Sequence, residues 1–140
     1  MASQNPSVLS HVSIGVNDYE KACAFYDAVL PALGIGLVME VEEGRAYGRA
    51  YSEFWVQRPL DGAPASVGNG AHVSFFATSK AQVEAFHREG VAAGATDDGA
   101  PGPRPEYGEP YYGAFLRDPD GHKIEATFWD QELARKLGME

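Results

Sequence analysis

Cysteine and positive charge are scarce in this sequence. The single cysteine among 140 residues, Cys23, excludes an internal disulfide framework and is compatible with a reducing compartment. The 11 Lys and Arg against 20 Asp and Glu give a formal net charge of −9, which repels phosphate backbones and anionic lipid. Because no local basic patch offsets this charge, we expect a protein that does not bind nucleic acid.

A secretion signal and a membrane span are also missing. The N-terminal MASQNPSVLSHV has no basic segment followed by an apolar one, and no window approaches the roughly 18 apolar residues of a membrane helix. We therefore expect a cytoplasmic protein with no membrane partner. A length of 140 residues fits a single domain with its own core, and 16 Gly with 9 Pro indicate many turns, as in a strand-rich domain.

The most informative segment is RDPDGHKIEATF, residues 117–128. Its Asp-Pro-Asp-Gly is a tight-turn sequence, because Pro presets φ, Asp bonds its own backbone and Gly accepts positive φ. After the turn, Ile124, Ala126 and Phe128 alternate with polar residues, which predicts a strand with one apolar face. Glu125 lies mid-strand on the polar face, where a carboxylate is either solvated or directed into a binding cavity.

The first half of the chain reads as a strand, a helix and three short strands. Alternation predicts the first strand over residues 9–16, and helical spacing predicts a helix from the N-cap Asp18 to the stop Gly34. Pro31 removes one helix hydrogen bond, so the last turn should be distorted. Three short strands are then expected at 35–41, 45–51 and 53–57, followed by a small-residue linker over residues 62–70.

The second half repeats this plan. The tripeptide His72-Val73-Ser74 repeats His11-Val12-Ser13. Ser79 and Gln82 form a capping box for a second helix over residues 79–93. A Gly- and Pro-rich loop, residues 97–110, is expected to replace or interrupt one strand, and the last two strands are expected at 111–117 and 122–128.

An internal repeat constrains the whole architecture. We expect an α+β fold in which two β-α-β-β-β modules pair their strands into a curved mixed sheet around a shared cleft. Module one covers about residues 8–62 and module two about residues 70–129. Residues 130–140 form a polar tail with helix-forming residues, and the whole chain, 1–140, is one domain.

The repeated plan, the His in the first strand of each half and the closing DPDGHKIE resemble the vicinal oxygen chelate superfamily. This superfamily contains glyoxalase I, extradiol ring-cleaving dioxygenases and bleomycin resistance proteins, and the resemblance spans about residues 9–128. It implies the glyoxalase-like fold, a small-molecule substrate and a homodimer. It also implies a divalent metal, Zn, Ni, Fe or Mn, held by His11, His72 and Glu125.

Two positions depart from glyoxalase I. Trp55 stands where glyoxalase I has a fourth, carboxylate ligand, although Glu53 and Gln57 flank it on the same face of the strand. Gly15 stands where bacterial-type glyoxalase I has an arginine that holds a glutathione carboxylate. Glutathione hemithioacetal is therefore not supported as the substrate.

Three functions remain open from the sequence. In a glyoxalase-like lyase or isomerase, the metal would chelate two vicinal oxygens of the substrate while Glu125 moves a proton. An extradiol-type dioxygenase uses two His and one Glu on Fe(II), which is the set that remains here. A metal-free antibiotic-binding resistance protein would instead trap its ligand between aromatic walls.

Residues that line a substrate cavity in any of these readings are Trp55, Gln57, Arg104, Tyr107 and Tyr112. A single strand histidine or solvated glutamate does not by itself indicate a metal site. The repeat-equivalent placement of His11 and His72, together with Glu125, is what favours a metal site.

Overall fold

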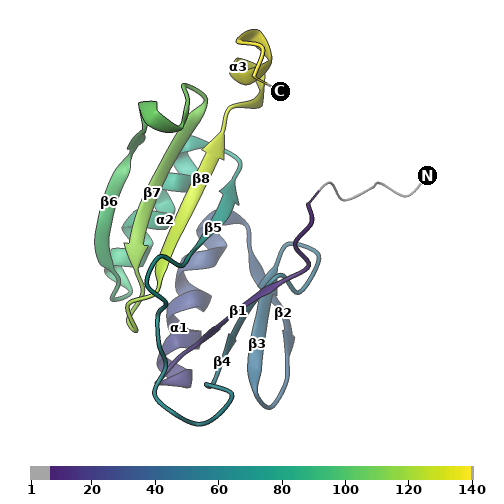
Figure 1. Cartoon of the computed structure of the whole chain (residues 1–140), viewed down its shortest axis with the longest axis vertical. Coiled ribbons are helices and arrows are strands. Elements are labelled where there is room, and N and C mark those ends of the chain that lie inside the picture. Colours follow the sequence, from purple (N-terminus) through teal and green to yellow (C-terminus); the bar gives the residue numbers. More distant parts are fainter. Residues whose placement is uncertain (1–6, 140) are drawn as a thin grey trace, which may run out of the picture.

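The computed structural model describes residues 7–139 and contains two β-α-β-β-β modules (Figure 1). Module one consists of β1 (Val12–Gly15), α1 (Tyr19–Val29), the 3-10 helix η1 (Leu30–Leu33), β2 (Gly36–Glu40), β3 (Gly44–Gly48) and β4 (Phe54–Gln57). Module two consists of β5 (His72–Ala77), α2 (Lys80–Ala92), β6 (Thr96–Pro103), the 3-10 helix η2 (Pro105–Tyr107), β7 (Tyr111–Arg117) and β8 (Lys123–Trp129). A terminal helix, α3 (Gln131–Lys136), follows in the predicted tail.

Each module forms its own four-stranded sheet, in the order β1-β4-β3-β2 and β5-β8-β7-β6. The first and last strands of each module pair in parallel, and the other neighbours are antiparallel. The registers match, since Ser13 lies opposite Trp55 and Ser74 lies opposite Glu125. The predicted α+β repeat is confirmed, with two separate mixed sheets that do not close.

The helices cover one face of each sheet and pack against each other, α1 against α2 and η1 against α2 (Figure 1). The core is continuous across the two modules, because the ring of Phe54 on β4 meets that of Phe75 on β5 edge to face at 5.0 Å. The largest fully buried side chains come from both halves: Tyr26, Tyr47, Phe86, Leu30, Leu33, Leu116, Ile124, Val16, Val29, Val56 and Val83. Within residues 7–139, no helix covers the opposite face of either sheet.

The first helix ends as the sequence predicts. Asp18 caps it by accepting a hydrogen bond from the Lys21 backbone N–H at 3.1 Å. The turn that contains Pro31 is the separate 3-10 helix η1, and Gly34 ends it with a left-handed φ of 71°. The expected distortion is therefore real, because proline cannot donate the hydrogen bond that would continue the α-helix.

The Gly- and Pro-rich segment at 97–110 differs from the expected loop. Its first half, residues 97–103, belongs to β6, an edge strand that pairs with β7 through two register irregularities. Pro and Gly weaken central strands, but an edge strand tolerates them because one side of its backbone needs no partner. Only the residues around η2 form the irregular connection to β7.

The Asp-Pro-Asp-Gly turn ties module two to module one. The Asp118 carboxylate is buried and accepts hydrogen bonds from the Tyr26 hydroxyl on α1 at 2.6 Å and from the His122 backbone N–H at 2.9 Å. The His122 ring donates from Nε2 to the Gly15 carbonyl on β1 at 2.7 Å. Gly121 supplies the positive φ, 97°, that the turn requires.

Residues 1–6 and 140 lie outside the described residues. The expectation about a secretion signal concerns residues 1–12, so half of that segment is among them. Among residues 7–139, none of the helices has the length and apolar character needed to span a bilayer.

Candidate functional site

The open face of module two carries the polar groups closest to chemistry. Alternate residues of a strand share a face, so His72, Ser74 and Glu125 lie on the side of the sheet opposite α2. On the other side, Ile124 and Ala126 are fully buried beneath the helix layer. Glu125 thus lies on the polar face of its strand, as the sequence predicts.

Glu125 is only 6% exposed, and both of its carboxylate oxygens contact polar neighbours. Its Oε2 accepts from the Tyr111 hydroxyl at 2.5 Å and from the Thr127 hydroxyl at 2.8 Å. Its Oε1 lies 3.1 Å from Nε2 of His72. Because the single Thr127 proton goes to Glu125, Ser74 Oγ must donate in the 2.6 Å contact with Thr127. The result is a chain of donors that ends on one carboxylate.

Tyr111 remains the neutral partner in this cluster. Burial, followed by the hydrogen bond to Glu125, raises the pKa of Tyr111 above its ordinary value, and the charge of Arg104 opposes this shift. The Tyr107 ring packs edge to face against the Tyr111 ring, with the two centroids 5.1 Å apart. Tyr111 is therefore a proton-bearing donor at physiological pH.

Cations border the same face. Phe115 lies opposite Glu125 in the sheet, and the ammonium of Lys123 lies 4.9 Å from its ring centroid. The guanidinium of Arg104 lies 5.8 Å from the same centroid. This arrangement places positive charge over the Phe115 ring in a chain of strongly negative net charge, with the Lys123 ammonium also 3.8 Å from the Asp98 carboxylate, and it can orient an anionic group.

The open face of module one forms a shallow hollow of about 820 Å³ that is lined by His11, Ser13, Glu53, Trp55 and Gln57, among others. His11 is exposed, and its Nδ1 lies 3.0 Å from the Ser10 hydroxyl. Trp55 is half-buried at the position that Glu125 has in module two. Module one therefore offers an imidazole and an indole, without a carboxylate at that position.

A narrower cavity of about 270 Å³ lies between the modules. His11 and His72 both line it, together with aromatic residues such as Phe54 and Phe75. Glu125 is not part of this lining. The two histidines thus share a rim, whereas the carboxylate contacts only one of them.

The donor set fits a divalent metal in part. His72 Nε2 and Glu125 Oε1 form an adjacent nitrogen and oxygen pair of the type that such ions bind. Within residues 7–139 of one chain, however, no three His, Cys, Asp or Glu residues come together as a metal-holding group. The chain by itself brings two of the three expected ligands together and leaves His11 apart.

The expected substrate residues divide in the same way. Arg104 and Tyr107 border the Glu125 cluster, and Trp55 and Gln57 lie on the open face of module one. Tyr112 is a correction: its hydroxyl donates to Glu84 on α2 at 2.8 Å, so it lies on the helix-covered face. Adjacent strand residues point to opposite faces, and it is the preceding residue, Tyr111, that reaches the site.

Sequence reasoning left Thr127 out of the candidate site and chose Tyr112 in place of Tyr111. For Thr127 a signal was available, because it follows Glu125 by two residues and shares its face. For Tyr111 the signal was ambiguous. The strand YYGAFLR is apolar or aromatic on both faces, so its parity could not be read from alternation.

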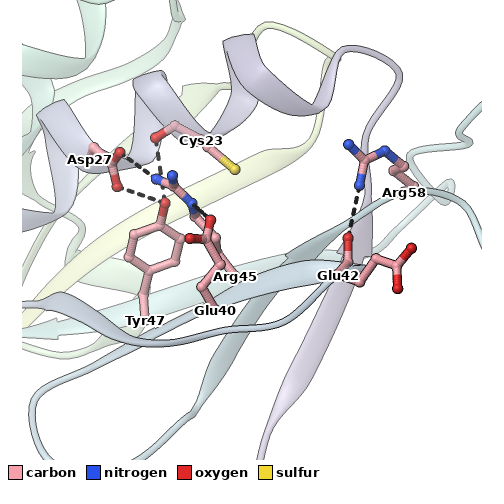
Figure 2. Close-up of polar contacts among 7 residues, drawn as sticks. All are labelled: Cys23, Asp27, Glu40, Glu42, Arg45, Tyr47 and Arg58. Atoms are coloured by element: carbon pink, nitrogen blue, oxygen red, sulfur yellow. Dashed lines mark hydrogen bonds and ion pairs between the residues drawn. The ribbon is translucent and has the colours of Figure 1, made fainter.

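A cluster of charged groups around Arg45 lies on the helix-covered side of module one (Figure 2). Arg45 on β3 bonds Asp27 on α1 at 2.8 Å and Glu40 on β2 at 2.5 Å. The Tyr47 hydroxyl donates to the other oxygen of Asp27 at 2.8 Å. Burial, and then this hydrogen bond, raise the pKa of Tyr47 well above its ordinary value. The cluster joins α1 to the sheet, and its side chains lie on the face opposite the open one.

Comparison with known proteins places this geometry in a family. Residues 8–126 match the family described as Glyoxalase/Bleomycin resistance protein/Dioxygenase superfamily. A solved glyoxalase/bleomycin resistance protein from Albidiferax ferrireducens T118 is 44% identical, with a TM-score of 0.76 over 86% of this chain and 98% of that one. No curated protein matches the sequence significantly.

More distant structures share the fold. A glyoxalase/bleomycin resistance protein/dioxygenase family enzyme from Burkholderia phytofirmans PsJN is 22% identical, with a TM-score of 0.65 over 86% of this chain and 98% of that one. A lactoylglutathione lyase from Agrobacterium tumefaciens is 20% identical, with a TM-score of 0.59 over 89% of this chain and 95% of that one. At such identities the likeness concerns the fold alone.

Proposed function

The chain belongs to the Glyoxalase/Bleomycin resistance protein/Dioxygenase superfamily, and on this premise we propose that it is a divalent-metal-dependent enzyme of the lyase or isomerase type. Its substrate is a small molecule that presents two vicinal oxygens. The observation that carries the proposal is the His72–Glu125 pair, an imidazole and a buried carboxylate 3.1 Å apart on an open sheet face.

The proposed metal ligands are His72 and Glu125 of one chain and His11 of a second copy. His11 and His72 occupy equivalent positions in the two modules, but one chain does not bring all three ligands together. The metal identity, Zn, Ni, Fe or Mn, is left to the experiment. Such an ion, when bound, supplies Lewis acidity to a chelated substrate oxygen.

The chain's own residues supply orientation and proton handling. Tyr111 and Thr127 hold Oε2 of Glu125, so Oε1 is the oxygen on the His72 side, which would either hold the metal or take a substrate proton when it is not bound to the metal. Lys123 and Arg104 would orient an anionic substituent of the substrate. Trp55 of the second copy would exclude water from the opposite wall.

A homodimer follows from this arrangement. Large apolar side chains are exposed on both open faces, including Phe76 at 72% in module two and Met39 at 47% in module one. Exposed apolar area of this kind marks interaction surfaces. A second copy that covers these side chains brings its His11 to the His72–Glu125 pair.

Metal analysis tests the proposal. The protein is purified without chelator, loaded with Fe, Ni, Zn or Mn, and its metal content is measured. We expect one tightly held ion per chain, lost in His11→Ala, His72→Ala and Glu125→Ala. The control is His87→Ala, because this histidine lies on α2 and bonds Asp97. Full retention of metal by any of the three ligand variants would contradict the site.

Mixing variants tests whether two chains share the site. Homodimers of His11→Ala and of Glu125→Ala each lack a ligand in both sites. A refolded mixture contains heterodimers with one intact site, which predicts recovery of about a quarter of the wild-type metal per chain if subunits pair at random. No recovery in a mixture that has exchanged subunits would mean that each chain builds its own site.

An extradiol-type dioxygenase is the second candidate, favoured by one observation. Trp55 occupies the position of a fourth carboxylate, which leaves the two His and one Glu of that reaction class. Oxygen consumption by the Fe(II)-loaded protein with a panel of catechols distinguishes the two. Failure to bind any metal would instead favour a metal-free binding protein, for which a ligand screen is the next step.

A further inference from the structure

We propose that Tyr111 is a positioning residue that fixes the orientation of the Glu125 carboxylate toward the site, and that the missing side chain at Gly113 lets Tyr111 reach it. The inference deepens the proposed function and rests on it in one respect, namely that Glu125 is the functional carboxylate. The hydrogen-bond geometry itself does not depend on a metal.

Tyr111 does not lie opposite Glu125 in the sheet. Its register partner is Trp129, and the partner of Glu125 is Phe115. Four residues along a strand correspond to roughly 13 Å, which the Tyr111 and Glu125 side chains can bridge together only when the tyrosine lies along the sheet surface. The 2.5 Å contact from the Tyr111 hydroxyl to Glu125 Oε2 therefore requires the phenol ring to pass over the intervening position.

That position is Gly113. A Cβ atom there would lie 2.1 Å from the Tyr111 hydroxyl oxygen and 2.5 Å from its Cζ. Both distances are well below van der Waals contact, so any other residue displaces the phenol. The opening in the sheet surface, and with it the Tyr111–Glu125 hydrogen bond, depends on the missing side chain.

Module one shows the same glycine without the tyrosine. Gly44 pairs with Gln57 as Gly113 pairs with Thr127, two residues beyond Trp55 and Glu125 respectively. A Cβ at Gly44 would lie 2.7 Å from the Val56 carbonyl, and one at Gly113 would lie 3.0 Å from the Ala126 carbonyl. Close backbone packing accounts for a glycine in both modules, but only module two has a tyrosine two residues earlier.

The consequence is a carboxylate with two unlike oxygens. Oε2 accepts two hydroxyl protons, from Tyr111 and Thr127, whereas Oε1 is paired only with His72. Rotation of the carboxylate would break both hydroxyl contacts. Tyr111 thus acts through Glu125, by keeping Oε1 directed to the side at which a ligand arrives.

Proton NMR of the metal-free protein tests this directly. A short hydroxyl–carboxylate bond at a buried site should give a slowly exchanging resonance downfield of the backbone amides. We expect it in the wild type and in Thr127→Val, and we expect its loss in Tyr111→Phe, Glu125→Gln and Gly113→Ala. The control is Gly36→Ala, another strand glycine, at which a Cβ meets nothing within 4 Å.

A double-mutant cycle separates the role of Gly113 from a general effect on folding. If Gly113→Ala acts by displacing the phenol, its effect on the denaturation midpoint should shrink in a Tyr111→Ala background, where only the Ala126 carbonyl contact remains. Equal effects in both backgrounds would overturn the proposed role of Gly113. A downfield resonance that persists in Gly113→Ala would overturn the dependence of the Tyr111 contact on Gly113. Absence of this resonance from the wild type would overturn the Tyr111–Glu125 contact itself.

The metal titration completes the test. In the metal-binding protein we expect Tyr111→Phe and Gly113→Ala to weaken affinity for Zn²⁺ by about tenfold or more, as loss of a hydrogen bond to a ligand does. Unchanged affinity in both variants would overturn the positioning role. If the wild type binds no Zn²⁺, the proposed function fails, while the NMR pattern and the mutant cycle still decide whether Gly113 places Tyr111 on Glu125.

Discussion

The two modules share one topology and use opposite faces for their charged groups. In module one the ionic cluster around Arg45 lies between the sheet and α1, where it ties secondary structure together. In module two the cluster around Glu125 lies on the open face, away from α2. The two modules therefore repeat the backbone plan without repeating its chemistry. Because alternate residues of a strand point to opposite faces, a shift of one position decides whether a carboxylate packs against a helix or faces a ligand.

The boundary between the modules should be the most sensitive part of the fold. Phe54 is 3% exposed and its ring contacts Tyr26 at 5.1 Å and Phe75 at 5.0 Å. Phe54→Ala should cost about 3–5 kcal/mol of unfolding free energy, through lost burial and the cavity left behind. Chemical denaturation measures this, with the 98%-exposed Leu60→Ala as the control. Two separate transitions in the wild type would show that the modules unfold independently.

The polar link between the modules should rank second. Tyr26→Phe removes the hydroxyl that donates to the buried Asp118 at 2.6 Å. Because the acceptor is a charged, desolvated group, the expected loss is about 2 kcal/mol. The same measurement on Tyr51→Phe, at a 70%-exposed position, should show almost no change. An equal effect of the two variants would mean that the turn does not need its contact with α1.

Alkaline pH should weaken module one through its two buried tyrosines. Burial raises the pKa of Tyr26 and Tyr47 above the ordinary value of 10.0, and hydrogen-bonded carboxylates add to the shift. Their contribution is complete below pH 10 and is lost as pH rises further, since the unfolded chain then releases protons that the folded chain keeps. The slope is about 1.4 kcal/mol per pH unit for each such tyrosine. Denaturation at stepped pH should show a shallower decline for Tyr26→Phe, and an unchanged slope would contradict this assignment.

The ionic cluster of module one should give the smallest effect. The Arg45 side chain is 26% exposed and Asp27 is 44% exposed, so solvent screens the pair and Arg45→Ala should cost about 0.5–1 kcal/mol. The loss should diminish in high salt. Metal content should stay at the wild-type level, because the cluster lies on the helix-covered side. A loss of metal in this variant would contradict the division of labour between the modules.

Local signals in the sequence were strong where local physics decides. The Asp18 cap, the distortion at Pro31 and the Gly34 stop follow from the chemistry of single residues, and all three are present. The failure at β6 has the opposite origin. A segment rich in Gly and Pro predicts a loop on propensity, but here it becomes an edge strand because β7 offers it a partner.

The candidate site was only partly visible for the same reason. Glu125 and His72 became candidates because alternation, the repeat and the family resemblance mark them, and their contact follows from the parallel pairing of β5 with β8. Tyr112 was preferred to Tyr111 because a strand that is apolar on both faces hides its parity. The parity was settled by α2, which contacts the Tyr112 side.

The sequence by itself determined the order of elements, the two-module plan, the Asp-Pro-Asp-Gly turn and the family. Each of these depends on residues that are near neighbours or on a repeat that can be read directly. Only the tertiary structure decided that this turn ties the modules together through Tyr26, that His11 lies apart from Glu125, and that Tyr111 lies over Gly113 to reach the carboxylate. These contacts join residues from different strands and helices, and packing alone sets the distance between them.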